Sequence, residues 1–366
     1  MSIVSTLSIL ALAASTLAQK CPIILEGRVP ATATPATFDT PESLFDPKNV
    51  KGDGLKFADL LTLPKLAKPS LFDKDTQAIS LSISDKSIFA PSPTNKQTGF
   101  RRVELIMAKN NGTDSSTIGQ RVIHFSIQKD DTKAFNTSHE YQLMFLEDAK
   151  FSTNQIAVKT GTVQGLEKLK NPGRSASGAA GAPKGNGTEK ADPKKKDEPA
   201  KKGDPAKKED PAKKNAAEDP SCSGMPLPVG TRKARRAVAE RQAKAAVGNT
   251  IIVQGNVNTD VGVLFETEFT GGGVWHNFGI VMDYDKNTTA VLYSTDANPL
   301  KEVVKPTKNE IGGQGQQHFG MLKKPTGEGL KDVTKEGFQQ SPVDEAIIYG
   351  GIFIEDGAKD CISTAP

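Results

Sequence analysis

Two glutamates in strand-like stretches are the residues of this sequence best suited to chemistry. Glu104 lies in Thr98-Gly-Phe-Arg-Arg-Val-Glu-Leu105, and Glu140 lies in Ser138-His-Glu-Tyr-Gln-Leu143, each close to a basic or imidazole side chain. Two convergent carboxyl groups can hydrolyse a glycosidic bond, because one protonates the departing oxygen while the other activates water or attacks the sugar. Alternatively, each glutamate pairs with a neighbouring Arg or His on a solvated strand face, since strand glutamates are common.

The neighbours of the two glutamates suggest different roles for them. Arg102 is two residues from Glu104, so a β-strand places both side chains on one face, and the guanidinium keeps Glu104 ionised, as a base requires. His139 points to the opposite face from Glu140, so Glu140 becomes the proton donor by elimination. An inverting pair would hold its carboxyls roughly 6.5–9.5 Å apart.

The elements that must position these residues are short β-strands. Runs such as Arg121-Val-Ile-His-Phe-Ser-Ile127 alternate two faces, and Gly, Pro, Asn and Asp separate the runs from one another. The pattern predicts an all-β chain that folds as an antiparallel two-sheet sandwich or jelly roll.

A charged, low-complexity segment interrupts this pattern. Residues 171–248 repeat Asp-Pro-Ala-Lys-Lys, hold 18 Lys/Arg against 10 Asp/Glu, and contain few apolar side chains, so we expect disorder there. We expect one jelly roll built from residues 19–170 and 249–366 and interrupted by this insert, because surface loops tolerate long insertions. Two small β-domains on a tether are the alternative.

The first residues and the overall charge indicate an exported protein. Residues 1–18 contain an apolar run too short to span a bilayer and are typical of a secretory signal peptide, so we expect a secreted, extracellular product. The formal net charge of +4 comes from the insert, so the rest is mildly acidic and has no nucleic-acid footprint. Four sequons are candidate glycan acceptors: Asn111, Asn136, Asn186 and Asn287.

Three cysteines suit an oxidising compartment. Cys21 follows the expected cleavage site and Cys361 lies near the end of the sequence, so a bridge between them would tie the ends of one compact domain. Cys222 is left in the low-complexity segment as a free thiol, an intermolecular link or a competing partner.

Ordered motifs lie on both sides of the insert. They are Cys21-Pro-Ile, Gly27-Arg-Val-Pro-Ala-Thr-Ala-Thr, Ser84-Asp-Lys-Ser-Ile-Phe89, the two glutamate stretches, Phe151-Ser-Thr-Asn-Gln155, Val274-Trp-His-Asn-Phe278, Gly315-Gln-Gln-His-Phe-Gly-Met-Leu-Lys-Lys-Pro-Thr-Gly327 and Asp344-Glu-Ala-Ile-Ile-Tyr-Gly-Gly-Ile-Phe353. Together these motifs resemble the fungal glycoside hydrolase family 131 catalytic domain. The resemblance implies a jelly roll with an open cleft and inverting hydrolysis of β-1,3-, β-1,6- and β-1,4-linked glucans. It assigns catalytic roles to Glu104, Glu140 and His276. The long insert departs from the family pattern.

Further side chains are candidates for holding the glucan. The expected substrate-binding residues are Arg102, Gln155, Trp275, Gln316, His318, Lys323 and Tyr349. Trp275 could stack against a glucose ring or be a buried aromatic, and the others could be ordinary surface or turn residues. The four histidines lack zinc-binding spacing, so we expect neither metal nor cofactor.

Two other classes of protein compete with a hydrolase. A non-catalytic β-glucan-binding lectin would share the jelly roll, but the paired glutamates favour the enzyme, and a single tryptophan does not make a flat stacking surface. A polysaccharide lyase would need acidic substrates and a Lys, Tyr or His base. We expect a monomer that acts on β-glucan, with no nucleic-acid or membrane partner.

Overall fold

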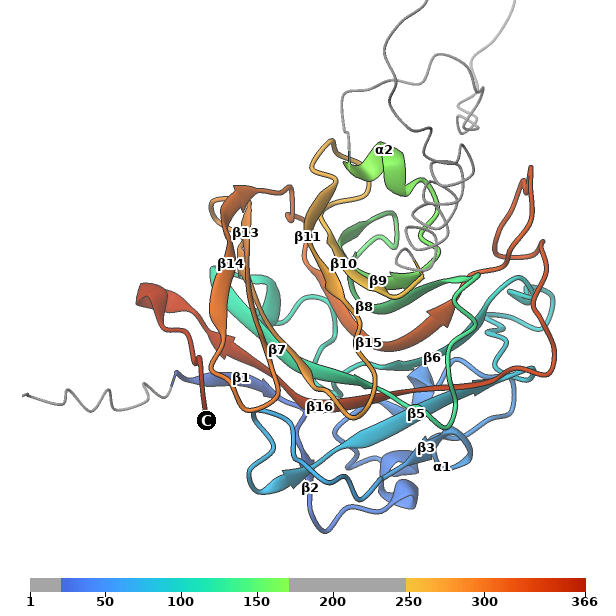
Figure 1. The fold of residues 1–366 in the computed structure, drawn as a ribbon, viewed down its shortest axis with the longest axis horizontal. Helices are drawn as coiled ribbons and strands as arrows, with labels where there is room; N and C mark the ends of the chain where they lie inside the picture. The colour runs from blue at the N-terminus through green and yellow to red at the C-terminus, as the bar shows by residue number, and fades with distance from the viewer. Residues whose placement is uncertain (1–20, 171–247) are drawn as a thin grey trace, which may run out of the picture. The chain divides into compact units, whose positions relative to one another are not determined.

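The computed structural model describes residues 21–170 and 248–366 (Figure 1). The predicted signal peptide, Asn186, Cys222 and all but the last residue of the predicted insert lie outside the described residues. Among the residues that are described, no helix is long and apolar enough to cross a membrane.

The described chain forms an antiparallel β-sandwich, which confirms the predicted all-β jelly roll (Figure 1). One sheet contains, in spatial order, β14 (Lys301–Lys308), β13 (Thr288–Thr295), β12 (His276–Asp283), β7 (Gln120–Lys129), β16 (Asp344–Asp356), β5 (Ile79–Ser84) and β3 (Leu61–Thr62), with β1 (Ile23–Glu26) also paired to β16. The other contains β11 (Val263–Glu268), β10 (Thr250–Gln254), β9 (Asn154–Gly161), β8 (Glu140–Asp148), β15 (Gly315–Lys323) and β6 (Arg101–Leu105). The smaller elements are β2 (Val29–Pro30), β4 (Thr76–Gln77), α1 (Phe57–Leu60), α2 (Leu166–Lys170), η1 (Pro35–Asp39), η2 (Pro47–Asn49), η3 (Ser115–Thr117) and η4 (Ala358–Asp360).

Each sheet combines strands that precede residues 171–247 with strands that follow them. β7 lies between β12 and β16, and β8 lies between β9 and β15. Neither part of the chain could bury its sheet faces without the other, so the two parts build one sandwich around a shared core.

Alternating apolar side chains fill the space between the sheets. On β7, Ile123, Phe125 and Ile127 face this core. Phe125 stacks on Phe278 of its own sheet at 5.1 Å between ring centroids, and it meets Phe319 of the other sheet edge-on at 5.7 Å. The side chains between these positions are therefore left to the outer faces of the sheets.

A β-bulge in β8 changes which of its side chains reach the outer face. The pairing of β8 with β9 shifts register between Gln142 and Met144, and its pairing with β15 shifts opposite the same place. Leu143 and Met144 are therefore both in the core, and the alternation restarts one residue later. The outer-face residues of β8 are consequently Glu140, Gln142, Phe145 and Glu147.

The hydroxyl of Tyr349, on β16 of the opposite sheet, occupies the gap that the bulge opens. It accepts the backbone N–H of Gly320 at 3.1 Å and lies within donating distance of the carbonyl oxygens of Gly320 (2.7 Å) and Leu143. Gly320 has φ +154°, and a Cβ there would lie 2.1 Å from the carbonyl oxygen of Val103 on β6. Tyr349 and Gly320 thus hold the register of β8 and β15.

We expect Tyr349→Phe to lower the free energy of unfolding by about 1–3 kcal/mol, because it leaves buried backbone groups without a partner. Urea unfolding of the variant and the wild type measures the difference. A variant as stable as the wild type would show that the bulge holds its register without this hydroxyl.

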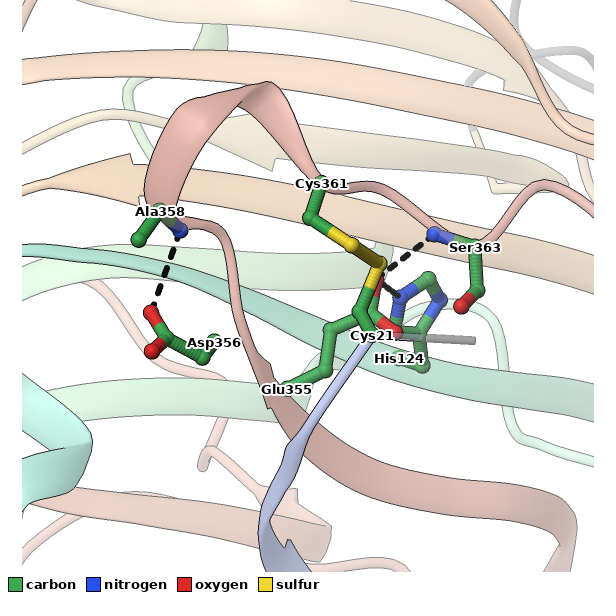
Figure 2. The surroundings of a disulfide bond; sticks show 7 residues. All are labelled: Cys21, His124, Glu355, Asp356, Ala358, Cys361 and Ser363. Atoms are coloured by element: carbon green, nitrogen blue, oxygen red, sulfur yellow. Dashed lines mark hydrogen bonds and ion pairs between the residues drawn. A yellow bond between two sulfur atoms is a disulfide. The ribbon is translucent and has the colours of Figure 1, made fainter. Parts of the chain in front are cut away.

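The predicted disulfide between Cys21 and Cys361 is present and joins residues 340 positions apart (Figure 2). Figure 2 shows a buried ion pair beside it: Glu355 on β16 contacts His124 on β7 at 2.8 Å and accepts the backbone N–H of Ser363 at 2.7 Å. The bridge and the carboxylate together fasten the end of the chain to the eight-stranded sheet.

We expect the double substitution Cys21→Ala and Cys361→Ala to lower the free energy of unfolding by about 2–5 kcal/mol, because the bridge restricts the unfolded chain. Guanidinium unfolding without reductant measures this effect, and wild-type protein in excess reductant serves as the matched control. If neither oxidised wild type nor its reduced form differs from the double variant, the bridge contributes nothing to stability.

Candidate active site

The Glu104 carboxylate is the centre of a buried charged cluster on β6. Val103 and Leu105 face the core, so Arg102 and Glu104 face outward. Arg102 Nε donates to Glu104 Oε1 at 2.6 Å, and a second guanidinium nitrogen contacts the same oxygen. His318 on β15 holds the other oxygen, with Nδ1 2.9 Å from Oε2. An ionised carboxylate can only accept, so Nδ1 carries the hydrogen.

This cluster keeps Glu104 ionised. Its side chain is only 1% exposed. Burial alone would raise the pKa of the Glu104 carboxyl, but Arg102 and His318 outweigh burial, and Lys51 adds to their effect, so the pKa lies well below its usual range. Glu104 is therefore ionised at neutral pH, as a general base must be.

A second carboxyl, Glu147 at the end of β8, faces the other nitrogen of His318. Glu147 Oε2 lies 3.7 Å from His318 Nε2, which is a charge contact but too long for a hydrogen bond. The imidazole stacks on Phe145 with 4.4 Å between ring centroids, which fixes its plane. The Glu147 side chain is 25% exposed and lines the polar pocket described below.

Glu147 has the opposite electrostatic environment from Glu104. Burial raises the pKa of the Glu147 carboxyl, His318 offsets part of this effect, and the negative charge of Glu104 adds to it, so the pKa lies above its ordinary value. One carboxyl whose pKa is lowered and one whose pKa is raised are the pair that acid–base hydrolysis requires. The His318 imidazole contacts both carboxyls, with Nδ1 2.9 Å from Glu104 Oε2 and Nε2 3.7 Å from Glu147 Oε2.

Glu140 lies on the same outer face at the start of β8, in a different environment. Lys324 Nζ and Lys159 Nζ lie 2.7 and 3.1 Å from its Oε1, and the backbone N–H of Gln164 donates to Oε2 at 2.8 Å. Burial would raise the pKa of Glu140, but the two ammonium groups outweigh it and lower the pKa. Glu140 is thus held ionised, which does not suit a proton donor.

A polar pocket of about 430 Å³ lies over this face of the sheet. Both Glu140 and Glu147 line it, together with Gln142, Phe151, Ser152, Thr153, Asn154, Lys159, Gln164, Leu169, Gln254, Val257 and Lys324. Its amides, hydroxyls and ammonium groups are suited to sugar hydroxyls.

Three of the expected substrate-binding residues belong to this region. Arg102 and His318 hold Glu104, as described. Gln316 is the cross-strand neighbour of Glu147, and its side-chain amide donates to the carbonyl oxygen of Asn110 at 2.7 Å.

Trp275 and His276 lie outside the Glu104 cluster and the polar pocket. Trp275 is fully buried against Ala78 and Ile348, and its indole N–H donates to the carbonyl oxygen of Lys68 at 3.1 Å, so no face is free to stack on a sugar. His276 packs against Phe269, with Nδ1 2.7 Å from the Tyr293 hydroxyl. Burial lowers the pKa of His276. In the described part of the chain, His276 contacts neither glutamate.

Lys323, Tyr349 and Gln155 are also structural in this arrangement. Lys323 lies between the sheets with its Nζ 2.6 Å from Glu345 Oε1, and Tyr349 holds the bulge. The Gln155 amide donates to the carbonyl oxygens of Gly312 and Gln314, at 2.8 and 3.1 Å. None of these three side chains lines the pocket, because each is buried by its own contacts.

Three of the four sequons fall in the described residues. Asn111 is exposed, whereas Asn287 is half-buried in the turn between β12 and β13. The Asn136 amide donates to Gln340 Oε1 at 2.6 Å, through the nitrogen that a glycan would occupy.

The sequence alone did not indicate Glu147, Lys159, Lys324 or Gln254. Glu147 lies at the end of a strand-like run, but simple alternation from Glu140 places it on the core side. The bulge at Leu143 reverses that assignment. Within the residues described, no group of three or more His, Cys, Asp or Glu side chains is arranged to hold a metal.

The fold is a jelly roll, and the outer face of one sheet carries two carboxyls whose pKa values are shifted in opposite directions. Together with the polar pocket, these are features of a glycoside hydrolase. The glycoside hydrolase 131 catalytic N-terminal domain matches residues 23–177 and 235–360, so this chain belongs to glycoside hydrolase family 131. No curated protein matches the chain.

Two solved structures of the same family share the fold. The chain superimposes with a TM-score of 0.56 and 16% identity on a β-glucanase catalytic domain from Podospora anserina. It superimposes with a TM-score of 0.54 and 17% identity on a family 131 catalytic domain from Coprinopsis cinerea. Each comparison covers 94% of this chain and 98% of the other.

Proposed function

We propose that this glycoside hydrolase is an inverting β-glucanase in which Glu104 is the general base and Glu147 the general acid. The observation that carries the assignment is His318, whose two nitrogens face one carboxyl held ionised and one whose pKa is raised. This proposal moves the proton donor from Glu140 to Glu147.

In the proposed reaction, Glu104 accepts a proton from water as the water oxygen bonds to the anomeric carbon. The bond from that carbon to the leaving oxygen breaks, and Glu147 donates its proton to that oxygen. Arg102 and His318 keep Glu104 in place and ionised until the proton arrives. Glu140 positions Lys159 and Lys324 at the pocket, where both amines can donate to sugar hydroxyls.

The substrate class proposed is β-glucan with β-1,3, β-1,6 and β-1,4 linkages. Membership of family 131 supports it, as does the β-glucanase title of the Podospora anserina structure. We also propose that the protein acts outside the cell, because residues 1–18 read as a signal peptide and because disulfides persist in oxidising compartments.

Sugar release from laminarin, barley β-glucan and a β-1,6-glucan tests this function. We expect reducing sugar from at least one polymer, and NMR of the first product should show the inverted, α anomer. Binding of the polymers without any release would instead favour the β-glucan-binding lectin. A β-anomeric first product would contradict the inverting mechanism while leaving the hydrolase class intact.

A further inference from the structure

Gln254, the last residue of β10, is a buried amide that lacks a partner. It is 3% exposed, and among the described residues its Oε1 has no hydrogen-bond partner. A buried acceptor left unpaired costs free energy, which a ligand hydroxyl would recover. Gln254 lines the same pocket as Glu147, so such a ligand would enter from the pocket.

Phe151, in the turn between β8 and β9, supplies an apolar face at the same pocket. Its side chain is 68% exposed although it is a large aromatic, and its backbone has φ +54°, a conformation that costs a bulky residue free energy. Asp148 holds the turn: its backbone carbonyl accepts from the Phe151 N–H at 2.9 Å, and its Oδ1 accepts from the Ser152 N–H at 2.6 Å. The turn therefore presents a largely exposed aromatic ring at the pocket.

The position of Gln254 relative to the carboxyl pair follows from the strand register. Gln254 pairs with Ala157, Ala157 with Phe145, and Phe145 with His318. Three strand spacings of about 4.8 Å each therefore separate Gln254 from His318. A ligand at Gln254 lies well away from the reacting bond.

We propose that this part of the pocket is a remote sugar subsite for an uncharged glucosyl unit of a β-glucan chain. The Phe151 ring packs on the apolar face of the pyranose, and the Gln254 amide accepts a hydroxyl proton on its edge. The subsite rests on the proposed function for the identity of the chain that it binds.

Binding of sugars to a Glu104→Gln background, by isothermal titration calorimetry, tests the subsite without turnover. Phe151→Ala and Gln254→Leu should each weaken binding of a β-1,3- or β-1,4-linked glucohexaose about threefold to tenfold, since one ring contact or one hydrogen bond is lost. Binding of the corresponding disaccharides, which are too short to reach from the carboxyl pair, should change less than about twofold. Phe338→Ala is the matched control, because Phe338 is also an exposed phenylalanine but does not line the pocket.

The melting temperature of both variants is compared with that of the parent. Because Phe151 is largely exposed, we expect Phe151→Ala to fold normally, so that variant tests the subsite even if Gln254→Leu is destabilised. Hexaose binding equal to that of the parent in both variants overturns the subsite, even if the wild type hydrolyses glucan. No hexaose binding by the parent also overturns it. If the wild type hydrolyses no glucan but both substitutions weaken hexaose binding, the subsite stands and the proposed function fails.

Discussion

Glu104→Gln should lower kcat/KM on β-glucan by about 10²–10⁴-fold, the usual contribution of a general base. The amide cannot accept the proton of the attacking water. In the wild type, Arg102 and His318 donate to the Glu104 carboxylate, and the amide of the variant would place N–H groups against these donors. Initial rates of reducing-sugar release, compared with wild type at several substrate concentrations, measure the loss.

Glu104→Gln also lowers the stability of the fold, so it needs a control substitution that removes a buried carboxylate away from the proposed site. Removing a buried carboxylate leaves Arg102 unpaired, which costs about 3–5 kcal/mol. Glu355→Gln removes another buried carboxylate whose pKa is lowered, because its contact with His124 outweighs burial. The contacts of Glu355 with His124 and Ser363 lie outside the Glu104 cluster. We expect Glu355→Gln to be destabilised but to keep its activity while folded. Wild-type activity in folded Glu104→Gln would exclude this residue as the base.

The same depressed pKa values give the pH dependence of stability a definite sign. The folded-state pKa values of Glu104, Glu140 and Glu355 are all lowered, so these groups stabilise the fold above their unfolded-state pKa. That stabilisation is lost as the pH falls through the folded-state values.

Glu147→Gln should lower kcat/KM by a similar factor of about 10²–10⁴ and should also remove one limb of the pH profile. The acid is active when protonated, and burial raises its pKa above the ordinary glutamate value. Wild-type activity should therefore fall as pH rises through that raised pKa, and the variant should lack this fall. Its residual rate should suffer least on an aryl glucoside, whose leaving oxygen needs little protonation.

Glu140→Gln is the matched control for Glu147→Gln. Both side chains lie on the outer face of β8 and line one pocket, but at Glu140 two lysines outweigh burial and lower the pKa. We expect Glu140→Gln to keep the fall in activity at high pH. It should change KM more than kcat, because it releases Lys159 and Lys324 from their ion pairs. If Glu140→Gln loses the limb and Glu147→Gln keeps it, the proton donor is Glu140.

The contact between Arg102 and Glu104 shows how much local sequence can determine. Both residues belong to one short strand, and alternation along a strand depends only on the pleat of the backbone. The expectation that they share a face therefore holds, with a 2.6 Å contact. The disulfide was predictable for a related reason, since the ends of compact domains often lie close together.

Trp275 and His276 show what alternation leaves open. The sequence indicates that these adjacent residues of an extended chain point to opposite faces, but it does not say what covers either face. Long-range packing covers both: Ile348 and Lys68 bury Trp275, and Phe269 and Tyr293 surround His276. The family resemblance implied a catalytic role for His276, and residue type left Trp275 either to stack on a sugar or to be buried. In the structure, the neighbours bury both side chains.

By itself, the sequence determined the jelly-roll class, the paired termini and the shared face of Arg102 and Glu104, because strand periodicity and composition are local properties. Only the tertiary structure decided the partners of Glu104. His318 comes from another strand, and Glu147 reaches the outer face because of the bulge that Tyr349 and Gly320 hold. A one-residue shift of register reverses every later side chain of a strand. Contacts between residues far apart in the sequence control that shift here.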